Sequence, residues 1–284
     1  EAALKDAQQQ RDRAEAESAR AIATRSFLEE MIAAPDPWKL QGGSPETRNV
    51  RVVEALQTAA ANLEKGLADN PALRGEIATM LGRTLRRLGQ LDAAREQLDA
   101  AVADLGKVDA AQAGPRMRAE LERALLLSEQ GEHAEAKKVF DQLLPGISAI
   151  DGLPAETIDE VRRAAANSLA ALGEGDAAEA LARENLQRAI SGDGEFSAAA
   201  SGAKAALADV LGERGSWDEA ERLITDAYNT ERQRLGQAHP SVLQLLANSA
   251  TLAFRRADFV LAEQRYREAA QSAEQVLGRE HPET

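Results

Sequence analysis

The sequence predicts an all-α fold, a solenoid of stacked helical hairpins, from three observations. The strong helix formers Ala, Leu, Glu and Arg dominate the 284 residues, and aromatic residues make up only 3%. The phrase "LGQAHPSV" returns as "LGREHPET", so that His239 and His281 are 42 residues apart. Small side chains also recur at this interval, and a fixed interval of this length is typical of repeat architectures.

The front of the chain is predicted to be helical but outside the repeats. We expect a leading helix over residues 1–34, whose early part is polar and whose later part carries an apolar patch at helical spacing. A loop over residues 35–47 follows, because Pro35 and Pro37 stop a helix. We expect a cap helix over residues 48–74. The apolar patch of the leading helix is formed by Phe27, Leu28, Met31 and Ile32.

Four columns of residues keep the 42-residue register through the rest of the chain. One column is alanine throughout, one is glycine with a single alanine, one is small, and one is leucine with a single alanine. In this order their members are Ala94, Ala136, Ala178, Ala220 and Ala262; Gly89, Gly131, Gly173, Gly215 and Ala257; Gly82, Ala124, Ala166, Ala208 and Ala250; and Leu85, Leu127, Leu169, Leu211 and Ala253.

Each column has a physical interpretation. The glycines are expected to end one helix in the left-handed cap conformation, and the acidic residues that often follow favour the start of the next helix. The small columns are expected where paired helices cross. The leucines form the apolar stripe between the helices. No single hairpin can bury its own apolar stripe, so we expect the five hairpins to stack.

The spacing of these residues resembles the tetratricopeptide repeat. The resemblance is carried by the pair Leu81-Gly82, by the segment "GSWDEA" at 215–220 and by "AEQRYREA" at 262–269. The 42-residue period resembles the long-helix variety of kinesin light chains and many bacterial signalling proteins. This resemblance implies a right-handed superhelix of five repeats, at about 75–116, 117–158, 159–200, 201–242 and 243–284.

The front region has a second resemblance. A charged helix followed by "FLEEMIAAPDP" and by "VRVVEALQTAAANLEKGLADNPALRGEIATMLGRTLRRLG" is similar to the region after the membrane helix of bacterial membrane-anchored serine/threonine protein kinases. The resemblance implies a kinase domain and a membrane span before Glu1. The chain starts without methionine and stops where a further helix should begin, so we expect it to be part of a longer protein.

Composition and motifs argue against chemistry in this segment. The net charge of −13 disfavours binding to nucleic acid or anionic lipid, and no apolar stretch is long enough to cross a bilayer. The chain has no cysteine and only three histidines. We expect His239 and His281 to be structural loop residues and His133 to pack. No metal, cofactor or catalytic residue is predicted, and the segment is not expected to be an enzyme.

Peptide binding is the positive prediction. In tetratricopeptide stacks the first helices line a concave face that holds peptides, and arginine suits carboxylates because of its planar donor fork. We therefore expect an acidic or C-terminal peptide on this face. The alternative is that the arginines of the face only keep it soluble or pair with nearby glutamates. The carboxylate clamp of chaperone-binding relatives is not transferred, because its slots hold Thr79, Arg83 and Glu122. The candidate residues are Arg83, Arg86, Arg87, Arg163, Asn167, Asp209, Thr251 and Arg255.

Two functions are expected for this segment. The first is a protein-interaction or sensor module of a membrane-anchored kinase, located outside the cytoplasm and forming a homodimer through the leading helix. The second is a cytoplasmic scaffold unrelated to a kinase. Both predict a protein or peptide ligand.

Overall fold

A computed structural model describes residues 45–68, 70–107, 113–150 and 153–277. The predicted leading helix (1–34), most of the predicted loop (35–47) and His281 lie outside these residues. Within the described residues the chain is helical and has no strand. The helices are α2 (Pro45–Gly66), α3 (Pro71–Arg87), α4 (Leu91–Leu105), α5 (Ala113–Glu129), α6 (His133–Leu143), the 3₁₀ helix η3 (Leu144–Ala149), α7 (Ala155–Ala171), α8 (Gly175–Asp193), α9 (Ala198–Glu213), α10 (Trp217–Leu235), α11 (Pro240–Arg255) and α12 (Phe259–Leu277).

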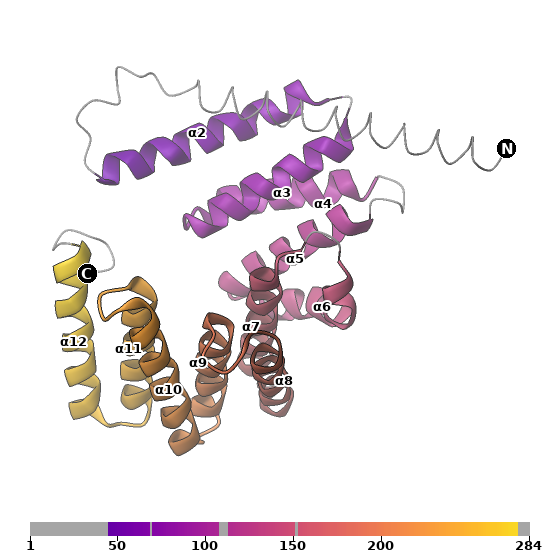
Figure 1. Cartoon of the computed structure of the whole chain (residues 1–284). Helices are drawn as coiled ribbons and strands as arrows, with labels where there is room; N and C mark the ends of the chain where they lie inside the picture. Colours follow the sequence, from indigo (N-terminus) through magenta and orange to yellow (C-terminus); the bar gives the residue numbers. More distant parts are fainter. Residues whose placement is uncertain (1–44, 69, 108–112, 151–152, 278–284) are drawn as a thin grey trace. The chain divides into compact units, whose positions relative to one another are not determined.

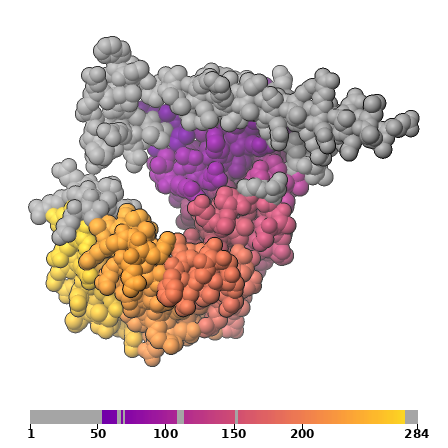
Figure 2. Space-filling view, viewed as in Figure 1, coloured from indigo at the N-terminus to yellow at the C-terminus, as the bar shows by residue number. Residues whose placement is uncertain are grey.

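The chain forms two compact units, residues 1–126 and 127–284. In the first, α2 packs on α3, and α3 pairs with α4 (Figure 1). In the second, α7 pairs with α8, α9 with α10, and α11 with α12, and each hairpin contacts the next. Figure 2 shows the surfaces of these last hairpins bordering one another in chain order, from red through orange to yellow. The helix before the first hairpin begins at Pro45, and the hairpin itself begins at Pro71.

One turn is used in every hairpin. The glycines at 89, 131, 173 and 215 have φ angles of 73°, 79°, 79° and 79°, and Ala257 takes the same conformation at 66°. In each turn the next N–H donates to the carbonyl of the leucine-column residue, as Gln90 does to Leu85 at 2.9 Å and Asp258 to Ala253 at 2.9 Å. This is the Schellman closure. The predicted glycine caps are confirmed.

The small columns lie where the helices touch. Ala94, Ala136, Ala178 and Ala220 are each 0% exposed. A Cβ atom built on Gly82 would lie 2.5 Å from Cγ of Leu98, which is closer than any real contact. The backbones of α3 and α4 therefore approach as closely as they do because Gly82 has no side chain.

Three residues shape the loop before α11. Gly236 has a φ of 84°, Pro240 is the first residue of the helix, and His239 is its N-cap. Nδ1 of His239 accepts a hydrogen bond from the N–H of Ser241 at 3.2 Å. Proline is tolerated there because the first N–H of a helix has no partner within the helix. His239 is thus a structural residue.

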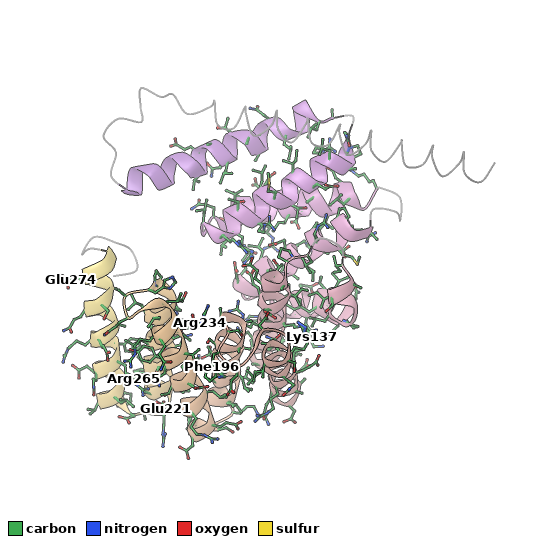
Figure 3. The ribbon with its side chains drawn as sticks, in the orientation of Figure 1. Lys137, Phe196, Glu221, Arg234, Arg265 and Glu274 are labelled. Atoms are coloured by element: carbon green, nitrogen blue, oxygen red, sulfur yellow. The ribbon has the colours of Figure 1, made fainter. Side chains whose placement is uncertain are left out.

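Ion pairs join successive second helices. Arg265 of α12 donates to Glu221 of α10, by Nη1 at 3.2 Å and also by Nη2, and Figure 3 labels both residues. Arg183 of α8 donates to Glu219 of α10 at 2.8 Å. These side chains are partly exposed, so each pair stabilises the stack by about 1 kcal/mol at most.

Overpacking tests the alanine column. Replacing Ala178 by Leu is expected to lower the free energy of unfolding by about 1–3 kcal/mol, because the crossing of α7 and α8 has no room for a larger side chain. Ala180→Leu on the same helix is the matched control, because Ala180 is exposed. A thermal melt of Ala178→Leu that matches the control would show that the column does not mark the crossing.

The turn column offers a reciprocal pair of changes. Gly173→Ala is expected to destabilise the chain by about 1 kcal/mol, since a Cβ there meets no atom within 4 Å and only the left-handed backbone is penalised. Ala257→Gly is expected to stabilise it by up to about 1 kcal/mol for the same reason. Chemical denaturation measures both changes, and equal signs would contradict the shared conformation.

Candidate functional site

The eight candidate residues fall in both units, three in the first and five in the second. In the first unit Arg83, Arg86 and Arg87 lie on one face of α3. Arg86 is 5% exposed, and its Nη2 lies 3.3 Å from Oε2 of Glu122 on α5. Nε of Arg83 lies 4.0 Å from Oε1 of the same carboxylate, and Arg87 is exposed. Two of the three arginines therefore face a glutamate of the protein, as the alternative interpretation expects.

The second unit brings the other five candidates onto three neighbouring first helices. α7 and α9 are in contact, as are α9 and α11. Asn167, Asp209 and Thr251 occupy one register position on these helices, 42 residues apart. They form a polar row, with Arg163 one turn before it on α7 and Arg255 one turn after it on α11.

The polar row has internal partners. Oγ1 of Thr251 donates to the carbonyl of Ala247 at 3.0 Å and lies 2.8 Å from Oη of Tyr266. Nη1 of Arg255 lies 3.7 Å from Oε1 of Glu213, with both side chains about half exposed. Arg163 and Asn167 are exposed. The face therefore offers both cationic and anionic groups.

Asp209 is the half-buried carboxylate of the row. Burial disfavours its charged form and raises the pKa of its carboxyl, the positive charge of Arg255 opposes this, and the negative charge of Glu213 adds to it. An ionised Asp209 therefore carries a desolvation cost at neutral pH.

Two buried cations escaped the sequence interpretation. Arg162 on α7 and Lys204 on α9 are 8% and 3% exposed. Each is paired with a carboxylate 22 residues later on the second helix of its hairpin. These partners are Glu184, at 3.1 Å from Nη1 of Arg162, and Asp226. The signal was present in the sequence, since both cations and both carboxylates keep the 42-residue register.

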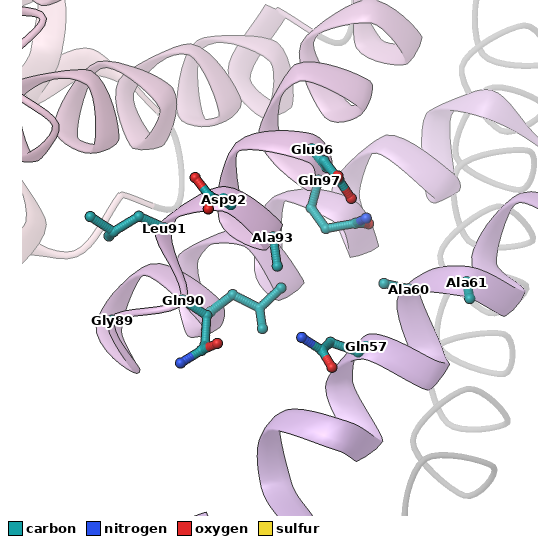
Figure 4. A pocket seen from close by; sticks show the side chains of 11 residues that line it. Gln57, Ala60, Ala61, Gly89, Gln90, Leu91, Asp92, Ala93, Glu96 and Gln97 are labelled. Carbon is teal, nitrogen blue, oxygen red and sulfur yellow. The ribbon is translucent and has the colours of Figure 1, made fainter. Parts of the chain in front are cut away.

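A hollow of about 590 Å³ opens between α2 and the first hairpin. Figure 4 shows Gln57, Ala60 and Ala61 of α2 on one side and Gln97 and Glu96 of α4 on the other. The walls are mostly amides, carboxylates and alanines. They do not provide the convergent donors or the apolar lining of a small-molecule site.

The part of the chain that the structure describes shows no grouping of metal ligands and no membrane-spanning helix. No three His, Asp or Glu side chains are grouped there so that they could hold a metal ion. None of the helices described is apolar over the length needed to cross a bilayer. His133 is half-buried, with Nδ1 3.3 Å from Oγ of Ser168.

Two stretches of the chain match a known family. Residues 75–108 and 242–283 match the family described as Tetratricopeptide repeat. The fold is a tetratricopeptide-type solenoid. Tetratricopeptide solenoids are an architecture for protein–protein interaction. No curated protein sequence matches the chain.

Solved structures agree on the fold. BtubC (BKLC) from P. vanneervenii is 19% identical, with a TM-score of 0.59 over 82% of this chain and 94% of that one. A putative kinesin light chain of Podosopora anserina with nearly identical TPR-like repeats is 20% identical, with a TM-score of 0.52 over 73% of this chain and 98% of that one. A substituted variant of that light chain is 19% identical, with a TM-score of 0.54 over 74% of this chain and 98% of the variant. At these identities the similarity concerns the fold alone.

The half-buried carboxyl of Asp209 makes the stability of the fold depend on pH. Because its native pKa is raised, the native state holds the Asp209 proton at pH values above 3.8, its usual pKa, where the unfolded chain has already lost it. Stability from this group is therefore greatest at low pH and falls as the pH rises through that window. Asp209→Asn is expected to raise the melting temperature at pH 7 and to give no gain at pH 3. An equal shift at both pH values would contradict this.

Proposed function

We propose that the first-helix face of the second unit binds an extended peptide that carries acidic groups. The observation that supports it is the polar row of Asn167, Asp209 and Thr251 on three adjoining helices. Arg163 lies one turn before Asn167 on α7, and Arg255 lies one turn after Thr251 on α11. The backbone of a peptide would hydrogen-bond with the row, and its carboxylates would pair with the two arginines. Asp209 and Glu213 would disfavour acidic groups in the middle of the peptide, which sets their spacing.

We further propose that the chain is the sensor part of a membrane-anchored bacterial serine/threonine protein kinase, held outside the cytoplasm. The support is the sequence similarity over about residues 10–100, with the polar leading segment and "FLEEMIAAPDP". On this proposal, ligand binding to the array biases dimerisation of the parent protein through residues 1–34. The alternative is a cytoplasmic scaffold, for which the same peptide-binding face would serve.

The gene decides between the two parents. The residues encoded before Glu1 are expected to contain an apolar span of about 20 residues and, before it, a kinase catalytic loop. A reporter that is active only outside the cytoplasm is expected to be active when it is fused after Thr284 in the parent protein. Absence of the span and the loop would favour the scaffold.

Peptide binding is tested with fluorescent peptides that carry two acidic residues at varied spacing. Arg163→Ala and Arg255→Ala are each expected to weaken binding about two- to fivefold, as for exposed ion pairs, and the effect should shrink at high salt. Arg267→Ala is the matched control, because this exposed arginine lies on α12, a second helix. If all three variants bind alike, the first-helix face is not the site.

A further inference from the structure

The second unit has a groove on the side formed by its second helices, away from the polar row. Its volume is about 350 Å³, and α6, η3, α7 and α8 line it. The apolar part of the lining includes Phe140, Leu144, Leu169 and Leu181, and the cations in it are Lys137 and Arg162. Figure 3 labels Lys137 on α6.

The groove arises from a break in the repeat. α6 has 11 residues, whereas α8, α10 and α12 have 19 each. Pro145 stops α6, because proline has no N–H to donate and its ring clashes with the preceding turn, and the chain continues as η3. The equivalent residue of the next hairpin, Gln187, lies inside α8. The short α6 and the start of η3 therefore form one wall of the groove, and α7 and α8 form the others.

Arg162 is a buried cation with an unfilled hydrogen-bond donor. Its side chain is 9% exposed, and Nη1 donates to Glu184, whose own side chain is 63% exposed. Nε is fully enclosed, and no acceptor for it lies among the described residues. The buried guanidinium is thus paired with a carboxylate that is itself mostly exposed, and an anion held in the groove would pair with its Nη atoms in a drier environment.

Lys204 occupies the same register position one hairpin later and provides the comparison. Its ammonium pairs with Asp226 and lies 3.4 Å from the carbonyl of Glu195. α8 runs unbroken past the position at which α6 stops. The same kind of buried cation thus has two oxygen partners where the second helix is complete, whereas Arg162 lines an open groove.

We propose that this groove binds the C-terminal residue of a peptide that ends in a large apolar side chain. The terminal carboxylate takes the place of Glu184 on the guanidinium of Arg162, beside the ammonium of Lys137. The apolar side chain lies on Leu144, Leu169 and Leu181, which are partly exposed in the groove. Glu184 and Asp141, the present partners of these two cations, are both more than half exposed. When the ligand displaces them, they are hydrated by solvent and are not left buried without a partner.

The size and chemistry of the groove select this ligand class. A volume of 350 Å³ is at the lower end for ligand sites, which suits one or two residues and not a long segment. Cations and apolar walls share this small space, so the carboxylate and the apolar group must be close together in the ligand. A C-terminal residue carries both on one Cα atom, and the planar fork of arginine matches its carboxylate.

The test titrates the full chain with short acetylated peptides by calorimetry. Acetyl-Gly-Gly-Phe as the free acid is expected to bind about tenfold or more tightly than its C-terminal amide, because the amide removes the charge-assisted hydrogen bonds. Acetyl-Gly-Gly-Gly free acid is expected to bind weakly, because it lacks the apolar group. Acetyl-Gly-Asp-Phe amide tests an internal carboxylate; if it binds as well as the free acid, the C-terminal assignment is wrong.

Variants locate the binding. Arg162→Met is expected to reduce binding of the free acid about tenfold or more, whereas the matched variant Lys204→Met should leave it unchanged. Lys137→Gln, at a more exposed position, is expected to weaken binding about two- to fivefold without affecting folding. Circular dichroism monitors folding in each case.

Controls separate this site from the peptide-binding face proposed above. Arg163→Ala and Arg255→Ala should leave binding of the free acid unchanged. The proposal is overturned if the free acid and the amide bind alike, or if folded Arg162→Met and Lys137→Gln proteins both bind with the affinity of the unchanged chain.

Discussion

The close approach of paired helices is the constraint on which the structure depends. It requires a side chain no larger than a methyl group at each crossing, and the alanine column, 0% exposed in four hairpins, supplies it. The turn between the helices has to return the chain to the same crossing each time, and the left-handed residue with its Schellman closure does this. Spacing, turn and crossing are therefore consequences of one geometry, and a side chain that violates any of them disturbs the packing of two helices together.

Contacts between hairpins are less uniform than contacts within them. Gly212 admits Leu252 of the following hairpin so closely that a Cβ on the glycine would lie 2.6 Å from its Cδ1. At the equivalent place two hairpins earlier, Ser128 and Ser168 have their hydroxyl oxygens 2.9 Å apart. A small residue faces a large one in the first case, and two small polar residues share a hydrogen bond in the second. Equivalent contacts between neighbouring hairpins are thus made by different pairs of residues.

The periodic part of the fold was predictable from sequence, and its departures were not. The cap glycines and the alanine crossings each follow from one residue's local chemistry, and His239 was predicted as a structural residue of its loop. The early end of α6 is caused by Pro145. The 42-residue register predicts a second helix of full length at this position, so it did not indicate the break. The pairing of Arg86 with Glu122 and of Arg162 with Glu184 joins residues on different helices. The register of Arg162 and Glu184 was visible in the sequence, but a register does not say which cation pairs with which carboxylate. The polar row was predicted residue by residue, but its internal partners, such as Tyr266 for Thr251, came from the second helix of the hairpin.

In the described part of the chain, the packed helices lie chiefly one or two places apart along the sequence. Such local contacts close short loops and so carry a low entropic cost of formation. A hairpin that leaves the ribosome already has most of its partners available, because they were synthesised just before it. The stack can grow from its first hairpin during translation. A newly made apolar stripe is covered as soon as the next forty or so residues emerge, roughly two to eight seconds later at ordinary synthesis rates.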